Sequence, residues 1–557
     1  MDPLYQTITG WGVYPSNQEI AVFGDKTAVH KALFEEMGIT RFRQELRGSV
    51  VDDSGNFTDL MDSLAAKLKI GVFDYGVTEY TLNIWSPPSS MKTNQDYSTG
   101  HNADGSVARL LEDKEQDFCD YIVKCLDHLT KEEKLPAPIA MSLQNEPSTA
   151  TAYQSCWYDK VQYKRVAIML RHTLDAAGYD GVKLMGPESD EYKNSVVWMG
   201  EGFSELLNDP EYNDAIDVLA SHSYKGKDAT DQNIIDWAQN VAKFPEKEAW
   251  MTEYCTAGNQ MGDLEIDRAI EAMRILTSDL AWGGINSWFW WLGWDPRYSA
   301  KNPYQEVILE GEGKTDLYKG TTYQVLAQLF NSVPVNSHVQ RMSTDDPTAA
   351  NKAALLSDLV AFNTGSGTVC MITNTSRVAK AYDISGLKGQ SASVYTTSEV
   401  NQSVKNTDSI NIIGETAKDV FVPARSIVIV TTDAADHAAP AVSVDENPQL
   451  FEENGSYTSR DQILHLSGSV DEQASVTVNG REVALGADFT FTADITLTEG
   501  GNIITIEAKD VNGNRSVKKL NVKYDPSYLA LVMEKTADRV NNTGYTLKGR
   551  VNTNLFI

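Results

Sequence analysis

The stretch PIAMSLQNEP, from Pro138 to Pro147, joins a short apolar run to the polar segment Gln144-Asn145-Glu146-Pro147. An amphipathic stretch, Lys160–Ala177, follows it, and the next apolar run is Val182–Gly186. A buried strand that ends in polar residues and leads into a helix is the repeating unit of parallel α/β folds. The same order recurs over the first 335 residues, so this unit decides the predicted fold.

Eight apolar runs alternate with eight amphipathic stretches along this part of the chain. The predicted strands are Ile8–Val13, Thr40–Glu45, Thr81–Trp85, Pro138–Leu143, Val182–Gly186, Val218–Ser221, Ala249–Thr252 and Ile285–Trp291. The predicted helices are Lys26–Met37, Thr58–Tyr75, Lys114–Lys131, Lys160–Ala177, Ser195–Leu207, Gln232–Lys243, Leu264–Leu280 and Lys319–Asn331. Eight such units predict a (β/α)8 TIM barrel over residues 10–334. A doubly wound open sheet is the alternative, although no Gly-rich phosphate turn follows the first strand.

Helical periodicity stops near Pro334, and short alternating runs rich in Thr, Ser, Val and Asn take over. Residues 335–433 are predicted to form an antiparallel β-sandwich side domain, and residues 434–440 a linker. Turn signals such as Asn479-Gly480 predict an immunoglobulin-like β-sandwich over residues 441–525. Residues 526–557 repeat part of that module and are predicted to be the start of a further β module. The expected fold is therefore multidomain.

The composition narrows the classes of partner. The 557 residues carry 77 acidic and 48 basic side chains, a net charge of −29, which argues against nucleic acid as a partner. No apolar run reaches the roughly 18 residues of a membrane helix. The five cysteines lack metal-ligand spacing, so we expect buried free thiols and neither a metal nor a cofactor. With no signal peptide in the sequence and a repeat cut short, we expect a monomeric part of a longer, secreted or cell-surface modular protein.

Two carboxylates follow corresponding strands of the predicted barrel. Glu146 comes after the fourth strand, and Glu253, in Met251-Thr252-Glu253-Tyr254, ends the seventh. Chemistry in such barrels sits at the carboxyl ends of the strands. Either motif alone can be a turn or a helix cap, but two Glu side chains at this rim form the pair that glycoside cleavage requires.

These motifs, with Trp85-Ser86-Pro87-Pro88 and the closing Pro423-Ala424-Arg425-Ser426 of the side domain, resemble glycoside hydrolase family 30 over about residues 5–432. The resemblance implies that Glu146 is the general acid/base, that Glu253 is the nucleophile and that Asn145 binds the sugar 2-hydroxyl. It also implies that residues 1–9 pair with the side β-domain.

Other residues at the predicted rim are candidates for binding substrate. Arg43 ends the second strand and can keep the nucleophile ionised, whereas His222 and Tyr224 follow the sixth strand and can orient Glu253 or the sugar. Glu188, after the fifth strand, is expected to support the catalytic groups. Flat aromatic rings stack on sugar faces, so Trp85 and Trp290 are the first candidate platforms. Trp291 is the further candidate, and strand alternation predicts that one of this tryptophan pair belongs to the core.

The resemblance points to xylan or arabinoxylan of plant cell walls as the substrate. In xylanases of this kind an arginine and a tyrosine of the eighth loop bind a glucuronate branch, and Arg297 and Tyr298 stand in that region. The loop from Leu292 to Lys319 is acidic, so we expect no strict glucuronate dependence. Long loops at Met91–Arg109 and Leu292–Lys319 leave endo-cleavage and xylobiose release both open. A β-1,6-glucanase or β-1,6-galactanase is the alternative, and a non-catalytic glycan-binding protein is a remote one.

Overall fold

The computed structural model of the protein describes residues 6–17, 26–198, 207–224, 231–256, 264–296, 307–311, 317–344, 358–399, 401–402, 404–405, 409–432, 440–453, 456–486, 488–510, 515–528, 531–533 and 549–551. The chain divides into two compact units. The first lies within residues 1–394 and 410–435, and the second within residues 395–409 and 436–557.

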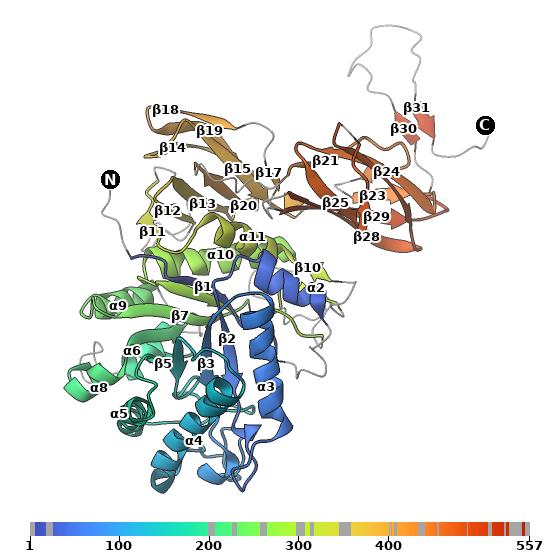
Figure 1. The fold of residues 1–557 in the computed structure, drawn as a ribbon. Coiled ribbons are helices and arrows are strands. Elements are labelled where there is room, and N and C mark those ends of the chain that lie inside the picture. Colours follow the sequence, from blue (N-terminus) through green and yellow to red (C-terminus); the bar gives the residue numbers. More distant parts are fainter. Residues whose placement is uncertain are drawn as a thin grey trace, which may run out of the picture. The chain divides into compact units, whose positions relative to one another are not determined.

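Eight parallel strands of the first unit close into a barrel in chain order, with β8 paired to β1 (Figure 1). The strands are β1 (Gly10–Val13), β2 (Arg41–Leu46), β3 (Glu79–Ile84), β4 (Ala140–Ser142), β5 (Lys183–Ser189), β6 (Val218–His222), β7 (Glu248–Tyr254) and β8 (Ser287–Trp290). Strands β1, β2, β4, β6 and β8 are buried at every position, because a parallel barrel is covered on both faces. The predicted (β/α)8 barrel is confirmed.

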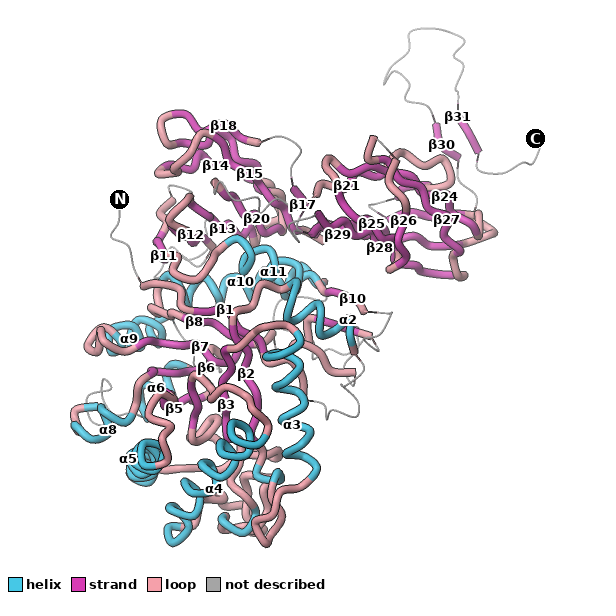
Figure 2. Tube along the Cα trace, viewed as in Figure 1, coloured by secondary structure: helices cyan, strands magenta, loops and turns pink. Residues whose placement is uncertain are grey.

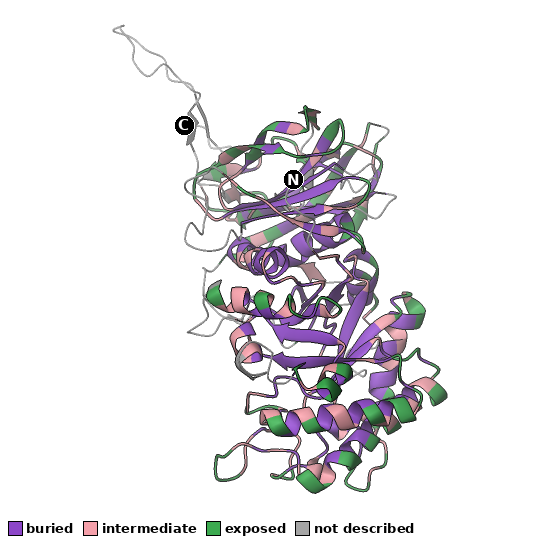
Figure 3. Cartoon of the chain, turned by 90° about the vertical axis from the view of Figure 1, so that its left-hand side faces the viewer, coloured by how far each residue is buried: buried purple, intermediate pink, exposed green. Residues whose placement is uncertain are grey.

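Helices surround the barrel strands (Figure 2). They are α2 (Thr27–His30, continued by a π-helical turn, Lys31–Glu36), α3 (Asp59–Lys69), α4 (Glu115–Asp127), α5 (Lys160–Ala176), α6 (Tyr192–Trp198), α8 (Pro210–Ala215), α9 (Asp231–Val241), α10 (Glu265–Ala281) and α11 (Thr321–Ser332). Side chains of Thr58 and Asp159 cap the first turns of α3 and α5. In Figure 3 the outer helices bury one face and expose the other, as their amphipathic patterns predict.

The region after β5 differs from the single helix predicted for Ser195–Leu207. Helix α6 begins earlier, at Tyr192, and residues 199–206 lie outside the described part of the chain. Helix α8 then begins at Pro210, with Asp209 accepting from the backbone N–H groups of Glu211 and Tyr212. The Asp-Pro pair is a helix-start signal that hydrophobic periodicity does not register.

Close packing inside the barrel depends on glycine in β1. A Cβ atom on Gly12 would lie 2.1 Å from Cδ1 of Phe289, and one on Gly10 would lie 2.2 Å from Nε of Arg41. The barrel interior therefore leaves no space for a side chain at either position. Phe289 itself packs against Trp250, with ring centroids 6.1 Å apart.

An antiparallel sheet forms the side domain in the strand order β11-β12-β13-β20-β15-β18-β19-β14. Its strands are β11 (His338–Arg341), β12 (Leu359–Asn363), β13 (Thr368–Asn374), β14 (Lys380–Ser385), β15 (Ser391–Thr397), β18 (Ile410–Ile413), β19 (Thr416–Val422) and β20 (Ser426–Thr431). Small and branched apolar side chains of these strands, among them Ile372, Val420 and Val428, form its core. The N-terminal segment contacts this domain through a bridge between Thr7 and His338.

Side chains on α10 and β1 join the barrel to the side domain. Arg425, from the Pro-Ala-Arg-Ser segment, forms an ion pair with Asp267 of α10, and Arg274 of α10 donates to Asp358 at 2.9 Å. Trp11 of β1 meets Phe362 of β12 edge to face, with ring centroids 6.4 Å apart. The two domains of the first unit thus share polar and aromatic contacts.

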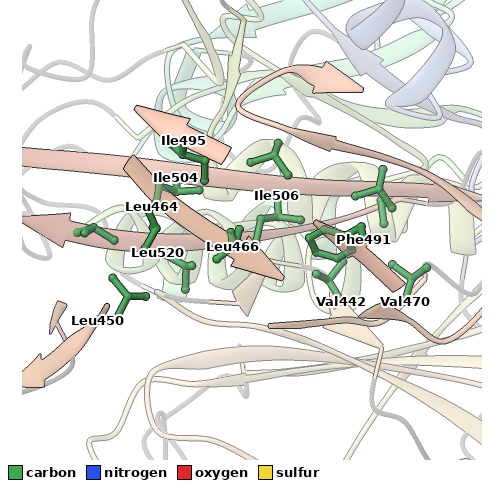
Figure 4. Close-up of a cluster of buried hydrophobic side chains, with 14 of the residues drawn as sticks. Val442, Leu450, Leu464, Leu466, Val470, Phe491, Ile495, Ile504, Ile506 and Leu520 are labelled. Atoms are coloured by element: carbon green, nitrogen blue, oxygen red, sulfur yellow. The ribbon is translucent and has the colours of Figure 1, made fainter. Parts of the chain in front are cut away.

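The second unit contains two packed sheets. One has the order β21 (Val442–Val444), β24 (Ile463–Val470), β27 (Thr490–Thr496), and the other the order β22 (Phe451–Glu453), β23 (Ser456–Ser459), β29 (Arg515–Tyr524), β28 (Gly500–Asp510), β25 (Ala474–Val478), β26 (Arg481–Val483). Buried side chains from both sheets, including Leu466, Phe491 and Ile506, meet between them (Figure 4). This is the predicted β-sandwich module. Residues 433–439, which include most of the predicted linker, lie outside the described residues.

All five cysteines lie in the described part of the chain, and they are buried thiols outside any disulfide, as predicted. Among the described residues, no helix combines the length and the hydropathy needed to cross a bilayer. Beyond the sandwich, β30 (Leu531–Met533) and β31 (Gly549–Val551) pair with each other.

Candidate active site

Polar side chains from five barrel strands meet at the carboxyl-end rim. Arg43 lies in β2, Glu188 in β5, His222 at the end of β6 and Glu253 in β7, while Glu146 follows β4. All five are at most 8% exposed. Because parallel strands end on the same rim, five separate segments deliver these groups to one place.

Arg43 links three partners. Its Nη1 donates to Glu253 Oε2 at 2.6 Å, and its Nη2 donates to Asn145 Oδ1 at 2.6 Å and to Glu188 Oε1 at 3.1 Å. Burial lowers the pKa of Arg43, but the charges of Glu188 and Glu253 outweigh burial and raise it overall. The guanidinium is thus a permanent positive charge between two carboxylates.

Glu188 lies deeper than the other carboxylates and is fully buried. It accepts hydrogen bonds from Asn83 Nδ2 at 2.5 and 2.6 Å and from the hydroxyl of Ser142. Burial alone raises the pKa of Glu188, but the charges of Arg43 and His222 and the hydrogen bond from Ser142 lower it to about 2. Glu188 is therefore a fixed negative charge that orients Arg43, in line with its predicted supporting role.

His222 connects the two candidate catalytic carboxylates. Its Nδ1 lies 3.0 Å from Glu146 Oε1 and 3.9 Å from Glu253 Oε1. Burial lowers the pKa of the imidazole, yet the charge of Glu253, the hydrogen bond to Glu146 and the proximity of Glu188 at 3.9 Å raise it to about 10. The imidazole therefore carries a proton near neutral pH, on the atom that faces Glu146.

Both oxygens of Glu253 have partners. Tyr224 donates its hydroxyl to Oε1 at 3.1 Å, and Arg43 occupies Oε2. Burial raises the pKa of Glu253, and the positive charges of His222 and Arg43 oppose that rise. One ligand atom from each of Glu146, His222 and Glu253 lies within 4.8 Å of the others, a spacing that could hold a metal ion. In this structure, however, these atoms bond to one another and to Arg43 and Tyr224, which is the arrangement of a catalytic acid/base pair.

The backbone places Glu146 and Glu188 in an unusual conformation. Their φ angles are 49° and 61°, in the left-handed region that non-glycine residues rarely adopt. The N–H of Glu146 donates to the backbone carbonyl of Glu188 at 3.0 Å, which couples the two positions. Such strain is retained where neighbouring contacts fix a functional side chain.

Aromatic rings lie beside the carboxylates. Trp85 stacks on Trp291 with ring centroids 5.2 Å apart and contacts Tyr153 at 5.8 Å. Tyr153 is 51% exposed, and burial of its hydroxyl together with the charges of Glu146 and Glu253 raises its pKa. These three rings form an aromatic wall of the site.

The structure separates the two adjacent tryptophans. Trp290 is 1% exposed and packs against Tyr254 and Trp288, whereas Trp291 faces Trp85 and Tyr14. The first-choice assignment of Trp290 as a sugar platform is therefore corrected: Trp290 is the core member of the pair, as strand alternation predicts for one of the two, whereas Trp291, which is 6% exposed, stays a candidate beside Trp85. Tyr298 lies outside the described residues.

Sequence reasoning missed several partners of the site. Asn83 and Ser142 are short polar residues within apolar strands, and their inward-facing positions could have marked them, since a buried polar group needs a partner. Tyr153 lies in an irregular segment without a periodic pattern, so no sequence signal distinguished it.

Two family models match the chain. Residues 147–319 match the glycosyl hydrolase catalytic core, and residues 440–525 match domain B of glucodextranase. No curated protein sequence matches the chain.

Solved structures share the arrangement of the first unit. A family 30 endoxylanase from Clostridium papyrosolvens C71 is 19% identical over 78% of this chain and 98% of its own, with a TM-score of 0.60. The family 30 subfamily 8 xylanase from Clostridium acetobutylicum is 17% identical over 77% of this chain and 97% of its own, with a TM-score of 0.61. An endo-β-1,6-glucanase is 17% identical over 78% of this chain and 92% of its own, with a TM-score of 0.57.

The matched catalytic core and the carboxylate pair at the barrel rim define the class: the protein is a glycoside hydrolase. Its barrel with an attached β-domain has the fold of the solved glycoside hydrolase family 30 enzymes.

Proposed function

We propose that the protein is a retaining glycoside hydrolase that cleaves β-1,4-xylosidic bonds in xylan or arabinoxylan, without strict dependence on glucuronate branches. The observation that carries this proposal is the spacing of the carboxylates: an oxygen of Glu146 lies within 4.8 Å of an oxygen of Glu253. Retaining glycosidases place the two groups about 5–5.5 Å apart, and inverting enzymes about 6.5–9.5 Å apart, because inversion needs room for water.

Glu253 has the environment of the nucleophile. Arg43 and Tyr224 hold its two oxygens, which fixes the orientation of the carboxylate. Their donated hydrogen bonds and the charge of Arg43 favour the ionised form that attacks the anomeric carbon. Water then releases the glycosyl group from Glu253, with Glu146 acting as the base.

Glu146 has the environment of the general acid. The proton on His222 Nδ1 faces Glu146 Oε1, so the two side chains can share one proton along the 3.0 Å hydrogen bond. With that proton on Glu146 and none on Nδ1, the net charge of the site is the same as with the imidazolium and the carboxylate. When the leaving oxygen takes that proton, Glu253 loses its negative charge by bonding to the anomeric carbon, so the net charge inside the barrel does not change.

Sugar binding is assigned to Asn145 and the aromatic wall. Because Oδ1 of Asn145 accepts from Arg43, its amide nitrogen remains as the donor for a sugar hydroxyl. Trp85 and Trp291 supply flat apolar surface for the faces of sugar rings.

Acidic residues next to Glu146 and in the eighth loop support cleavage that does not need a uronate. Burial raises the pKa of Asp190, and the negative charge of nearby Glu146 raises it further. Glu310 of the eighth loop is 9% exposed, in the two-residue strand β9 (Leu309–Glu310). Arg297 and Tyr298, the candidate uronate ligands, lie outside the described residues.

Two similar structures are described as xylanases, which favours xylan, and a third as an endo-β-1,6-glucanase, which keeps β-1,6-glucan as the second candidate. We further propose plant cell-wall polysaccharide as the partner of a monomeric, secreted or cell-surface enzyme, since another similar structure is described as an exported protein.

The test is hydrolysis of glucuronoxylan, arabinoxylan, linear β-1,4-xylan, β-1,6-glucan and β-1,6-galactan by the full chain and by Glu253→Ala. We expect wild type to release sugar from all three xylans and Glu253→Ala to release none. Activity confined to glucuronoxylan would overturn the claim of uronate independence. Activity on β-1,6-glucan alone would overturn the substrate, and no activity on any polymer would leave the glycan-binding alternative.

A further inference from the structure

A second group of metal-ligating side chains lies on the helices outside the barrel. Asp62 is in the first turn of α3, His128 begins the π-helical turn His128–Glu132 that follows α4, and Glu133 comes next. One ligand atom from each of Asp62, His128 and Glu133 lies within 4.8 Å of the others. Helices α3 and α4 follow the adjacent strands β2 and β3, so the group spans two neighbouring helices.

His128 is the residue that distinguishes this group from an ordinary acidic surface. It is 9% exposed, and its Nε2 is buried without a hydrogen-bond partner among the described residues. Glu133 Oε1 lies 3.8 Å from Nε2, which is too long for a hydrogen bond. Buried polar atoms normally have a bonding partner. A cation between Nε2 and Glu133 Oε1 would supply one to both atoms.

The other ring nitrogen is already fixed. His128 Nδ1 lies 2.9 Å from Glu132 Oε2, and because an ionised carboxylate only accepts, Nδ1 carries the hydrogen. In the neutral ring Nε2 therefore presents its lone pair toward Glu133. Metal-binding histidines commonly donate their second N–H to a carboxylate in this way.

We propose that Asp62, His128 and Glu133 bind a divalent transition-metal ion, with zinc as the first candidate, and that the ion ties α3 to the end of α4. Imidazole with two carboxylates suits zinc, whereas calcium and magnesium take all-oxygen ligands. Two tetrahedral zinc ligands are about 3.4 Å apart, so the 3.8 Å separation of Nε2 and Oε1 needs only a small closing movement.

Lys69 limits how the ion can bind. Its ammonium forms an ion pair with Glu133 Oε2, which leaves Oε1 to face His128. Three protein ligands leave one position for water on the exposed side of the group, next to Asp62. The ion would stabilise the fold by binding only the folded chain.

The direct test uses the full chain stripped with EDTA and dialysed against zinc chloride. Asp62→Asn removes one ligand from an exposed position, and Asp113→Asn, in the 3-10 turn Glu112–Lys114, is a matched exposed control. We expect wild type and Asp113→Asn to hold one zinc ion per chain more than Asp62→Asn. Any zinc that binds at the active-site residues binds equally to all three proteins, so it does not affect the difference in stoichiometry between them. Equal stoichiometry in wild type and Asp62→Asn would overturn the proposal.

Melting temperature and affinity give a second readout. Zinc should raise the melting temperature of wild type and of Asp113→Asn by more than it raises that of Asp62→Asn. Glu132→Gln, which weakens only the support of the imidazole, should lower zinc affinity roughly tenfold to a hundredfold. A zinc-induced shift of the same size in wild type and Asp62→Asn would contradict a site built from these residues.

Discussion

Arg43 Nη1 donates to Glu253 Oε2 across 2.6 Å, and the side chains of Arg43 and Glu253 are 1% and 8% exposed. A charge pair at this depth has little water to replace a lost partner. The same guanidinium also contacts Glu188, whose side chain has no exposed surface. We therefore expect Arg43 both to orient Glu253 and to stabilise the barrel interior.

Replacing Arg43 should destabilise the protein strongly. Arg43→Ala leaves Glu188 and Glu253 buried without their shared cation, and we expect the free energy of unfolding to fall by about 3–5 kcal/mol. Arg43→Lys keeps the charge but not the fork of donors, so its loss should be smaller. Urea unfolding of both variants checks this order. Wild-type stability in Arg43→Ala would rule out Arg43 as the interior counter-charge.

Leaving-group chemistry separates the roles of the two carboxylates. Glu146→Gln removes the general acid, so hydrolysis of xylan should slow by about 10²–10⁴-fold. An aryl xyloside with an acidic phenol leaving group needs no protonation, so its first step should be nearly as fast in Glu146→Gln as in wild type. Glu253→Gln should be inactive on both substrates. Equal losses of Glu146→Gln on both substrates in stopped-flow assays would remove Glu146 from the acid role.

Stability should depend on pH through Glu188 and His222. The pKa of Glu188 falls from 4.5 to about 2, so its contribution is present above pH 4.5 and is lost as the pH falls through 2. The pKa of His222 rises from 6.5 to about 10, so its contribution is complete below pH 6.5 and is lost as the pH rises through 10.

We therefore expect maximal stability between about pH 4.5 and 6.5, with a decline toward pH 10. His222→Gln lacks the imidazole, so its free energy of unfolding should fall less steeply between pH 6.5 and 10, even if its stability at every pH is lower. Unfolding free energies from pH 5 to 10 for both proteins test the slope. Parallel curves for wild type and His222→Gln would contradict a raised imidazole pKa.

The aromatic wall predicts a contrast between tryptophans. Trp85→Ala should lower kcat/KM on xylo-oligosaccharides by about tenfold, since loss of one stacking surface costs on the order of 1.4 kcal/mol. Trp291→Ala should behave similarly. Trp290→Phe should lower the melting temperature and leave KM unchanged, because Trp290 is in the core. An increase of KM in Trp290→Phe as large as in Trp85→Ala would contradict this division.

The barrel and the carboxylate pair could be predicted because both depend on local order in the sequence. Apolar runs such as Val218–Ser221 identify strands, and in a parallel barrel the residue after a strand is at the rim. That rule predicts that Glu146 and Glu253 lie together, although 107 positions separate them in the sequence.

The sequence named Arg43, Glu188, His222 and Tyr224 as members of the network behind the pair, but not which of its groups bond to one another, since that depends on side-chain depth and direction. Glu188 follows the same kind of strand as Glu146, yet Asn83 and Ser142 hold it at the bottom of the site as a permanent anion. The choice between Trp290 and Trp291 depends on the bend at the end of β8, and the partners of Tyr153 come from distant segments. Periodicity reports which residues are buried and does not report which buried groups meet.

The most direct measurement is the configuration of the sugar that is released first. Proton NMR during early hydrolysis of a xylo-oligosaccharide by wild type distinguishes the β-anomer from the α-anomer before they equilibrate. Double displacement at Glu253, with Glu146 as acid and then base, predicts the β-anomer first. Release of the α-anomer first would contradict it.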